Sequence, residues 1–186
     1  MKQARKSWPY RLARRNKQRL FFLDESGAQT NMTRRYGRAV HGERLVSTAP
    51  AGHWSSLTMV CAILIDQVVA PMVTGGPMNR LVFQGYVDWL LVTELKPGDT
   101  VVMDNLSSHK SKSIEATGAK LLYLPPYSPD LNPIEKMWSK VKACLRAEEK
   151  RTKRTLLTAI GKALKTVTKQ DCQGFFRSSG INATSI

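Results

Sequence analysis

Hydrophobic residues gather along the chain in five short runs, which predict the strands of a β-sheet. Each run is rich in β-branched or aromatic residues and is bounded by polar or turn-forming residues, as is typical of buried strands. The second and third runs are separated only by Asp66 and Gln67, so we expect a hairpin there. The polar stretch over residues 26–45, in which glycines recur, predicts two or three further short strands. The five main predicted strands cover residues 19–25, 57–65, 68–76, 100–104 and 120–124.

Apolar residues at helical spacing predict helices between and after these strands. The first covers residues 79–95, with Asn79 as its N-cap, and we expect its buried face to hold Val82, Tyr86, Trp89 and Leu90. A short basic helix is expected over residues 110–117. Further helices follow Pro133, one of them over residues 155–167. This order predicts an α/β protein with a mixed five-stranded sheet flanked by helices, in which the antiparallel hairpin comes first and parallel units follow.

The charge of the chain indicates what kind of partner it binds. Lysine and arginine number 29 against 14 acidic residues, a net charge of +15. An excess of this size favours a polyanionic partner, most commonly nucleic acid. Residues 1–18 are basic and contain no acid, so we interpret them as a basic N-terminal arm or linker, followed by one domain over residues 19–186.

The remaining composition indicates a cytoplasmic protein. The longest apolar run, residues 59–65, is too short to span a bilayer, and no apolar segment follows the N-terminal charges as in a signal peptide. The three cysteines lie far apart and show no zinc-binding spacing. We therefore expect no membrane association and a reducing compartment.

Two predicted strands end in aspartate, and this suggests a site. Asp24 follows residues 20–23 and Asp104 follows residues 100–103. If the strands are neighbours, the two carboxylates meet at one edge of the sheet, where ligands of open α/β sheets bind. Close carboxylates repel each other unless a proton or cation lies between them. With no histidine or cysteine cluster nearby, the cation that fits is Mg²⁺ or Mn²⁺.

Glu135 is a third candidate because of the stiff segment that precedes it. Four prolines lie in residues 125–133, and Pro133 suits the first position of a helix capped by Asn132. Prolines reduce backbone freedom, so the carboxylate would be aimed with little entropy left to lose. The same helix carries an apolar stripe that would hold it to the sheet, formed by Ile134, Met137, Trp138, Val141 and Leu145.

The motifs "FLDESG", "VVMDNLSSHK" and "LPPYSPDLNPIEKMWSKVK" resemble those of insertion-sequence transposases of the Tc/mariner superfamily, over roughly residues 19–175. The resemblance implies a ribonuclease H-like fold and a catalytic, metal-binding triad of Asp24, Asp104 and Glu135. Glu25 is the rival for the first position. It also implies two Mg²⁺ or Mn²⁺ ions, DNA cleavage followed by strand transfer, a TA target, a homodimer on double-stranded DNA, and a bacterial, nucleoid-associated location.

The basic residues near these acids are expected to contact DNA phosphates with little sequence preference. Three arginines follow the first strand, two basic residues and a histidine follow Asp104, and three lysines lie off the apolar stripe of the Glu135 helix. These residues are Arg34, Arg35, Arg38, His109, Lys110, Lys112, Lys136, Lys140 and Lys142.

Two features depart from the resembled family. The chain lacks the usual N-terminal helix-turn-helix region, so we interpret it as the downstream product of a split reading frame or as a truncated copy. In addition, thirty residues separate Asp104 from Glu135, which is about one helical turn fewer than is usual in the family. Two alternatives therefore stand beside the transposase interpretation. One is a catalytically inactive DNA-binding relic, and the other is a general nuclease of the same fold.

Overall fold

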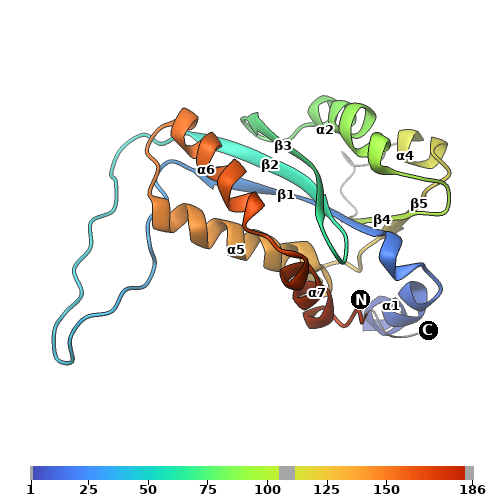
Figure 1. The fold of residues 1–186 in the computed structure, drawn as a ribbon, viewed down its shortest axis with the longest axis horizontal. Coiled ribbons are helices and arrows are strands. Elements are labelled where there is room, and N and C mark those ends of the chain that lie inside the picture. The colour runs from blue at the N-terminus through green and yellow to red at the C-terminus, as the bar shows by residue number, and fades with distance from the viewer. Residues whose placement is uncertain (1, 105–111, 183–186) are drawn as a thin grey trace.

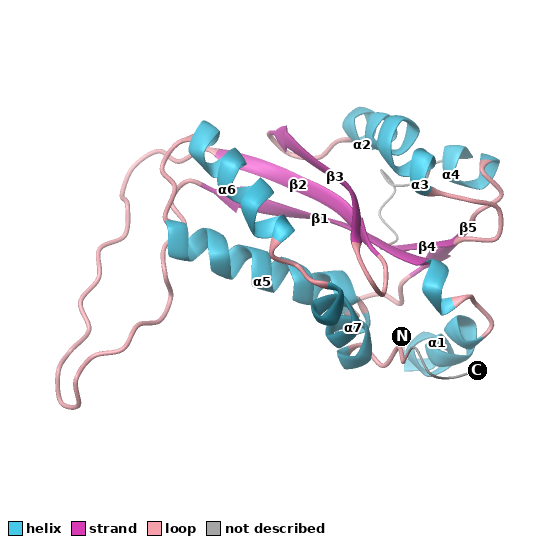
Figure 2. Cartoon of the chain, in the orientation of Figure 1, coloured by secondary structure: helices cyan, strands magenta, loops and turns pink. Residues whose placement is uncertain are grey.

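A five-stranded mixed sheet forms the centre of the computed structural model, which describes residues 2–104 and 112–182 (Figures 1 and 2). The strand order is β3-β2-β1-β4-β5. β1 pairs antiparallel with β2 and parallel with β4, so the sheet changes direction at its central strand. The strands are β1 (Leu20–Gln29), β2 (Ser56–Ile63), β3 (Val68–Gly75), β4 (Thr100–Met103) and β5 (Lys120–Tyr123).

Helices cover both faces of the sheet, which confirms the predicted α/β class. Successive side chains of a strand point to opposite faces. Phe22 accordingly joins the core beneath α1, α5, α6 and α7, whereas Phe21 and Leu23 join the core beneath α2–α4. The helices are α1 (Lys2–Ala13), α2 (Arg80–Tyr86), α3 (Val92–Glu94), α4 (Lys112–Ala116), α5 (Pro133–Glu148), α6 (Lys153–Lys165) and α7 (Lys169–Ser178).

The N-terminal segment, which its charge predicted to be a basic arm or linker, is mostly helical. Residues 2–13 form α1, and both Trp8 and Leu12 are buried in the larger core. Arg11 lies over the ring of Trp8, 5.8 Å from its centroid. Burial of these two apolar side chains holds the helix against the domain. The division at residue 18 stays a prediction, but the basic charges of this segment are carried by a packed helix.

The predicted short strands over residues 26–45 are partly wrong. β1 continues as far as Gln29 because the whole length of β2 pairs with it, from Phe22↔Ile63 to Gln29↔Ser56. Residues 31–55 then form a long loop without helix or strand, exposed from residue 34 to residue 54. Figure 1 shows this loop extending away from the domain between β1 and β2. Few apolar residues in this stretch are available to cover a further strand.

The helix predicted over residues 79–95 is present, but its buried face is shifted. Asn79 caps it as expected, accepting a hydrogen bond from the Val82 N–H at 3.0 Å. A π-helical turn over Val87–Leu91 then separates α2 from α3 and changes the phase of the helix. Tyr86 is buried as predicted, but Trp89 is 82% exposed. The buried positions are Phe83, Tyr86, Val87 and Leu91.

The C-terminal helices follow the sequence pattern closely. All five residues of the predicted α5 stripe are buried, and the ring of Phe22 on β1 packs edge-on against Phe176 of α7 at 5.3 Å. α6 and α7 each begin with a capping box, at Thr152 and Thr168. These caps satisfy the free N–H groups of the first helical turn, so α6 begins at Lys153, two residues before the predicted start at residue 155, and α7 begins at Lys169.

No helix in the described ranges combines the length and the apolar character that crossing a lipid bilayer requires.

Candidate active site

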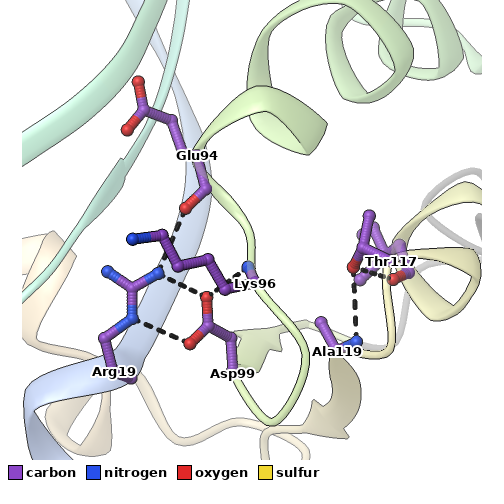
Figure 3. Close-up of polar contacts among 7 residues, drawn as sticks. Arg19, Glu94, Lys96, Asp99, Thr117 and Ala119 are labelled. Atoms are coloured by element: carbon purple, nitrogen blue, oxygen red, sulfur yellow. Dashed lines mark hydrogen bonds and ion pairs between the residues drawn. The ribbon is translucent and has the colours of Figure 1, made fainter.

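An ion pair at the beginning of β1 and β4 sets how these two strands align (Figure 3). Arg19 donates to both carboxylate oxygens of Asp99, at 2.8 and 2.5 Å, and to the Glu94 carbonyl at 3.2 Å. The backbone N–H of Lys96 donates to the same Asp99 carboxylate at 2.7 Å. Arg19 directly precedes Leu20 and Asp99 directly precedes Thr100, and these two residues are register partners. The ion pair therefore fixes the parallel register from its first residue.

This register brings Asp24 and Asp104 to the same level of the sheet. Asp24 is four residues beyond Leu20, and Asp104 is four residues beyond Thr100. The two carboxylates consequently lie side by side where the β1–β4 pairing ends. Asp104 follows the end of β4, as the sequence predicted. Asp24 does not end its strand, because β1 continues on its β2 side after the pairing with β4 has stopped.

Glu135 reaches this edge from α5. Pro133 occupies the first helical turn, and the buried stripe of α5 packs the helix against β1. Asn132 takes the N-cap position but makes no side-chain cap, so the expected capping role is wrong. Its side chain is only 6% exposed, and its Oδ1 atom has no hydrogen-bond partner within the described ranges. Sequence reasoning missed this buried acceptor, since an asparagine before a helix has the signature of a cap.

The three acidic residues line one cleft of about 520 Å³. Its remaining wall is the proline-rich segment that leads into α5, including Pro125, Pro126, Pro129 and Asn132. Tyr127 lies on this wall with its side chain 86% exposed and its backbone in the left-handed region, at φ 54°. A non-glycine residue in that region is held there at some cost in energy, and such residues cluster at functional sites.

Helix α1 anchors the same wall from outside. Arg5 donates to both carboxylate oxygens of Asp130, at 3.0 and 2.6 Å, and to Ser128 Oγ at 2.7 Å. The bidentate geometry orients the proline-rich segment as well as attracting it. The hydrogen bond and charge of Arg5 keep the pKa of Asp130 below its ordinary value. A segment far away in the sequence thus helps to position the entry to the cleft.

Asp24 carries the electrostatic signature of the site. The pKa of its carboxyl is raised from 3.8 to about 7, chiefly by burial and also by the nearby charges of Glu135, Asp104 and Glu25. A hydrogen bond from the Glu25 backbone N–H acts in the opposite direction. Strongly perturbed carboxyl groups in a cleft are typical of catalytic and metal-binding sites.

The donor atoms of the cleft fit a hard divalent cation. Three carboxylates and the unpaired Asn132 Oδ1 offer only oxygen, the ligand type that Mg²⁺ and Mn²⁺ prefer. Within residues 2–104 and 112–182, no three His, Cys, Asp or Glu side chains lie close enough to hold one ion together. Binding of a cation would therefore have to draw the acids closer than this structure places them.

The predicted DNA-contacting residues occupy different surroundings. Arg34, Arg35 and Arg38 lie in the exposed loop, Lys112 begins α4, and Lys136 is exposed on α5 next to Glu135. His109 and Lys110 lie outside the described residues.

Lys140, which was predicted to contact DNA, forms an ion pair within the protein instead. It forms an ion pair with Asp171 at 2.5 Å and also donates to the Thr166 carbonyl at 3.1 Å. This contact joins α5 to the start of α7. Sequence reasoning placed Lys140 among the DNA-contacting lysines because it lies off the apolar stripe, and it passed over Arg146, which lies on the same helix. The spacing of Glu135, Lys142 and Arg146, at i, i+7 and i+11, indicates one helix face and could have found it.

The sheet order, its flanking helices and the acids at its edge define a ribonuclease H-like domain. A family model described as DDE superfamily endonuclease matches residues 19–157. This chain belongs to that family. Comparison with curated protein sequences gave no match.

Solved structures of Mos1 transposase share the fold. The Mos1 strand transfer complex is 17% identical with a TM-score of 0.77, and the match covers 96% of this chain and 56% of that chain. The mariner Mos1 paired-end complex with Mg is 16% identical with a TM-score of 0.73, covering 96% and 57%. The catalytic domain of Mos1 mariner transposase is 12% identical with a TM-score of 0.64, covering 95% and 82%. This chain thus spans little more than half the length of the complexes, and these matches confirm the fold.

Proposed function

We propose that this chain is the catalytic domain of a transposase, which cleaves DNA and transfers the cleaved strand with the help of Mg²⁺ or Mn²⁺. The proposal rests on one observation above the others: in a member of the DDE superfamily endonucleases, Asp24, Asp104 and Glu135 from three separate elements line a single cleft. Two of the Mos1 paired-end complexes were solved with Mn and with Mg, which supports the choice of cation.

Two successive displacements at phosphorus would carry the reaction. In the first, a water oxygen attacks a phosphodiester at the transposon end, and the P–O3′ bond breaks to leave a 3′-hydroxyl and a 5′-phosphate. In the second, that 3′-oxygen attacks a phosphodiester of the target, which we propose to be a TA step, and the target's own 3′-oxygen leaves. Two divalent ions, when bound, would stabilise the charge on the attacking and leaving oxygens.

The protein's own residues would prepare this chemistry. Asp24 and Asp104 are aligned by the strand register, and Glu135 is carried by the packed α5 helix, so the backbone that carries all three is held in place and cation binding would draw the carboxylates together. The raised pKa of Asp24 favours the protonated form of this carboxyl, and cation binding would displace that proton. No covalent intermediate between protein and DNA is required.

The partners in this proposal are double-stranded DNA and a second copy of the chain. Joining two transposon ends requires two active sites in one assembly, so we propose a homodimer on DNA. The Mos1 structures are described as a transpososome, paired-end complexes and a strand transfer complex, which supports such an assembly here. We place this activity on the bacterial nucleoid.

Replacing Asp104 with asparagine tests the assignment. We expect Asp104→Asn and Glu135→Gln to lower Mn²⁺-dependent cleavage by about 10³-fold, because a lost metal ligand removes several kcal/mol of transition-state stabilisation. Binding of duplex DNA, measured by fluorescence anisotropy in EDTA, should be kept. Lys162→Gln, which removes one exposed charge from α6, serves as the control and should keep cleavage.

The same assay separates the proposal from its alternatives. Cleavage of unrelated DNA without joining would identify a general nuclease, and binding without any cleavage by the unaltered chain would identify an inactive relic. Cleavage that persists in Asp104→Asn would show that the three acids are not the catalytic set.

A further inference from the structure

A second groove lies beside the acidic cleft and has the opposite charge. Its volume is about 450 Å³, and three elements contribute to it: β1, the loop after β1, and α5. Its basic residues are Arg35, Lys142 and Arg146, and no acidic side chain belongs to its lining as described. The other lining residues are Gly27, Gln29, Asn31, Met32 and Thr33.

The three cations are gathered against their mutual repulsion. Lys142 and Arg146 are one helical turn apart on α5 and both are half-buried. Burial lowers the pKa of the Lys142 ammonium, and the charges of Arg146 and Arg35 lower it further. Burial and Arg35 lower the pKa of Arg146 in the same way. Within the described ranges, no ion pair compensates any of the three, so an anion from outside would relieve the repulsion.

The groove lies at a defined distance from the acids, because β1 and α5 run together. Figures 1 and 2 show α5 lying along β1. Gly27 is three residues beyond Asp24, which corresponds to ~10 Å along a strand. Lys142 is seven residues beyond Glu135, which corresponds to ~10.5 Å along a helix. The acidic cleft and the basic groove are therefore separated by about the same distance along β1 as along α5.

Lys142 connects the two sites. The charges of Glu135 and Asp24 act to raise its pKa, which shows that it lies within electrostatic reach of the acidic cleft while lining the groove. The edge of β1 that faces away from β2 also opens here, since β4 pairs only with Leu20–Phe22. A strand edge without a neighbour offers backbone N–H groups to an acceptor.

We propose that this groove binds a backbone phosphate of the DNA strand about three base pairs from the reacting bond. The spacing follows from the ~10 Å offset and the rise of 3.4 Å per base pair of a duplex. Two guanidinium groups and one ammonium group suit a phosphodiester, with Asn31, Gln29 and Thr33 as further polar neighbours. This inference rests on the proposed function, and it adds a subsite that orients the substrate across the acids.

The test compares two double variants that lose the same charge. Lys142→Gln with Arg146→Gln empties the groove of two cations, whereas Lys153→Gln with Lys165→Gln removes two exposed lysines from α6. Binding of a 30-base-pair duplex of arbitrary sequence is measured by anisotropy in EDTA, over a range of salt concentrations. We expect the groove variant to bind about tenfold more weakly, with the slope of log affinity against log salt smaller by about 2. The α6 variant should keep the slope of the unaltered chain.

Further measurements make the result decisive. Lys142→Arg with Arg146→Lys keeps both charges and should keep the salt slope, which separates charge from folding. The proposal is overturned if the groove variant and the α6 variant lose affinity equally, or if neither changes the slope. Because binding is measured without metal, it is independent of cleavage. If the catalytic proposal fails, the unaltered chain does not cleave DNA but the groove variant still has the smaller salt slope. If the groove proposal fails, the unaltered chain still cleaves DNA but the groove and α6 variants no longer differ in slope.

Discussion

Asp171 shows how one carboxylate can set the pH range over which a helix is anchored. Its pKa is lowered from 3.8 to about 2, first by the hydrogen bond from Lys140 and then by those from the Thr168 backbone and hydroxyl. The fold thus favours the charged form. Its contribution to stability is complete above about pH 4 and is lost as the pH falls through about 2.

Replacing Asp171 with asparagine should therefore destabilise the protein only where the carboxylate is charged. At pH 7 we expect the melting temperature to fall by ~2–4 °C, which corresponds to about 1 kcal/mol in a chain of this size. Below pH 2 the variant and the unaltered chain should melt alike. Thermal unfolding followed by circular dichroism at both pH values measures this. An equal difference at both would mean that the contact acts through packing instead of charge.

At the scale of elements, the Arg19–Asp99 ion pair holds β1 and β4 in register. Asp99 is almost completely buried, its side chain being 4% exposed, whereas Arg19 is 30% exposed. Removing one partner of such a pair leaves a buried charge without compensation, at a cost of about 3 kcal/mol. We expect Arg19→Met to lower the free energy of unfolding in urea by that amount. The double variant Arg19→Met with Asp99→Asn should recover part of the loss.

The Arg5–Asp130 pair provides a matched control for this prediction. It is also bidentate, through Nη1 and Nη2 instead of Nε and Nη2, but its side chains are 41% and 57% exposed. Solvent screens such a pair, so Arg5→Met should lower the free energy of unfolding much less than Arg19→Met does. Equal losses in Arg5→Met and Arg19→Met would contradict the role given to burial.

The elements that sequence reasoning predicted correctly are those whose hydrophobic period is unambiguous. The α5 stripe and the hairpin across Asp66 and Gln67 are both in this group. Trp89 was placed on the wrong face because the predicted face was built on Val82 and Tyr86, whereas Phe83, Tyr86 and Val87 set the buried face, and Trp89 points away from it. α1 was missed because only Trp8 and Leu12 hold it, and two apolar residues among many charges do not form a pattern.

The candidate site also has features that local sequence patterns predict and features that depend on long-range contacts. The acids were identified because Asp24 and Asp104 follow apolar runs and Glu135 follows prolines, which are local signals. Their meeting in one cleft depends on a parallel register that Arg19 and Asp99 fix from opposite parts of the chain. The basic groove forms because Arg35 and Arg146, which are more than a hundred residues apart in the chain, lie close together in the fold. No local sequence pattern indicates that proximity.

At the scale of the whole molecule, opposite charges are separated over a short distance. The chain has a net charge of +15, yet three carboxylates gather in its cleft. Those carboxylates repel the phosphates of any DNA that approaches them. The surrounding lysines and arginines attract the same phosphates, and this attraction weakens as salt is added. A basic surface around an acidic centre thus allows a polyanion to reach a site that would otherwise reject it.

The exposed loop over residues 31–55 makes the chain divisible. Trypsin should cut it first, after Arg34, Arg35, Arg38 or Arg44, because this backbone is irregular and open to solvent. The two fragments would carry β1 and β2, which stay paired over eight residues of register, and Arg151 holds the start of the loop through the Thr30 and Met32 carbonyls. We expect two bands on a denaturing gel but a single peak in size-exclusion chromatography. The central strand would then be exchangeable, and an isotope-labelled N-terminal fragment added during refolding could be reconstituted with an unlabelled remainder.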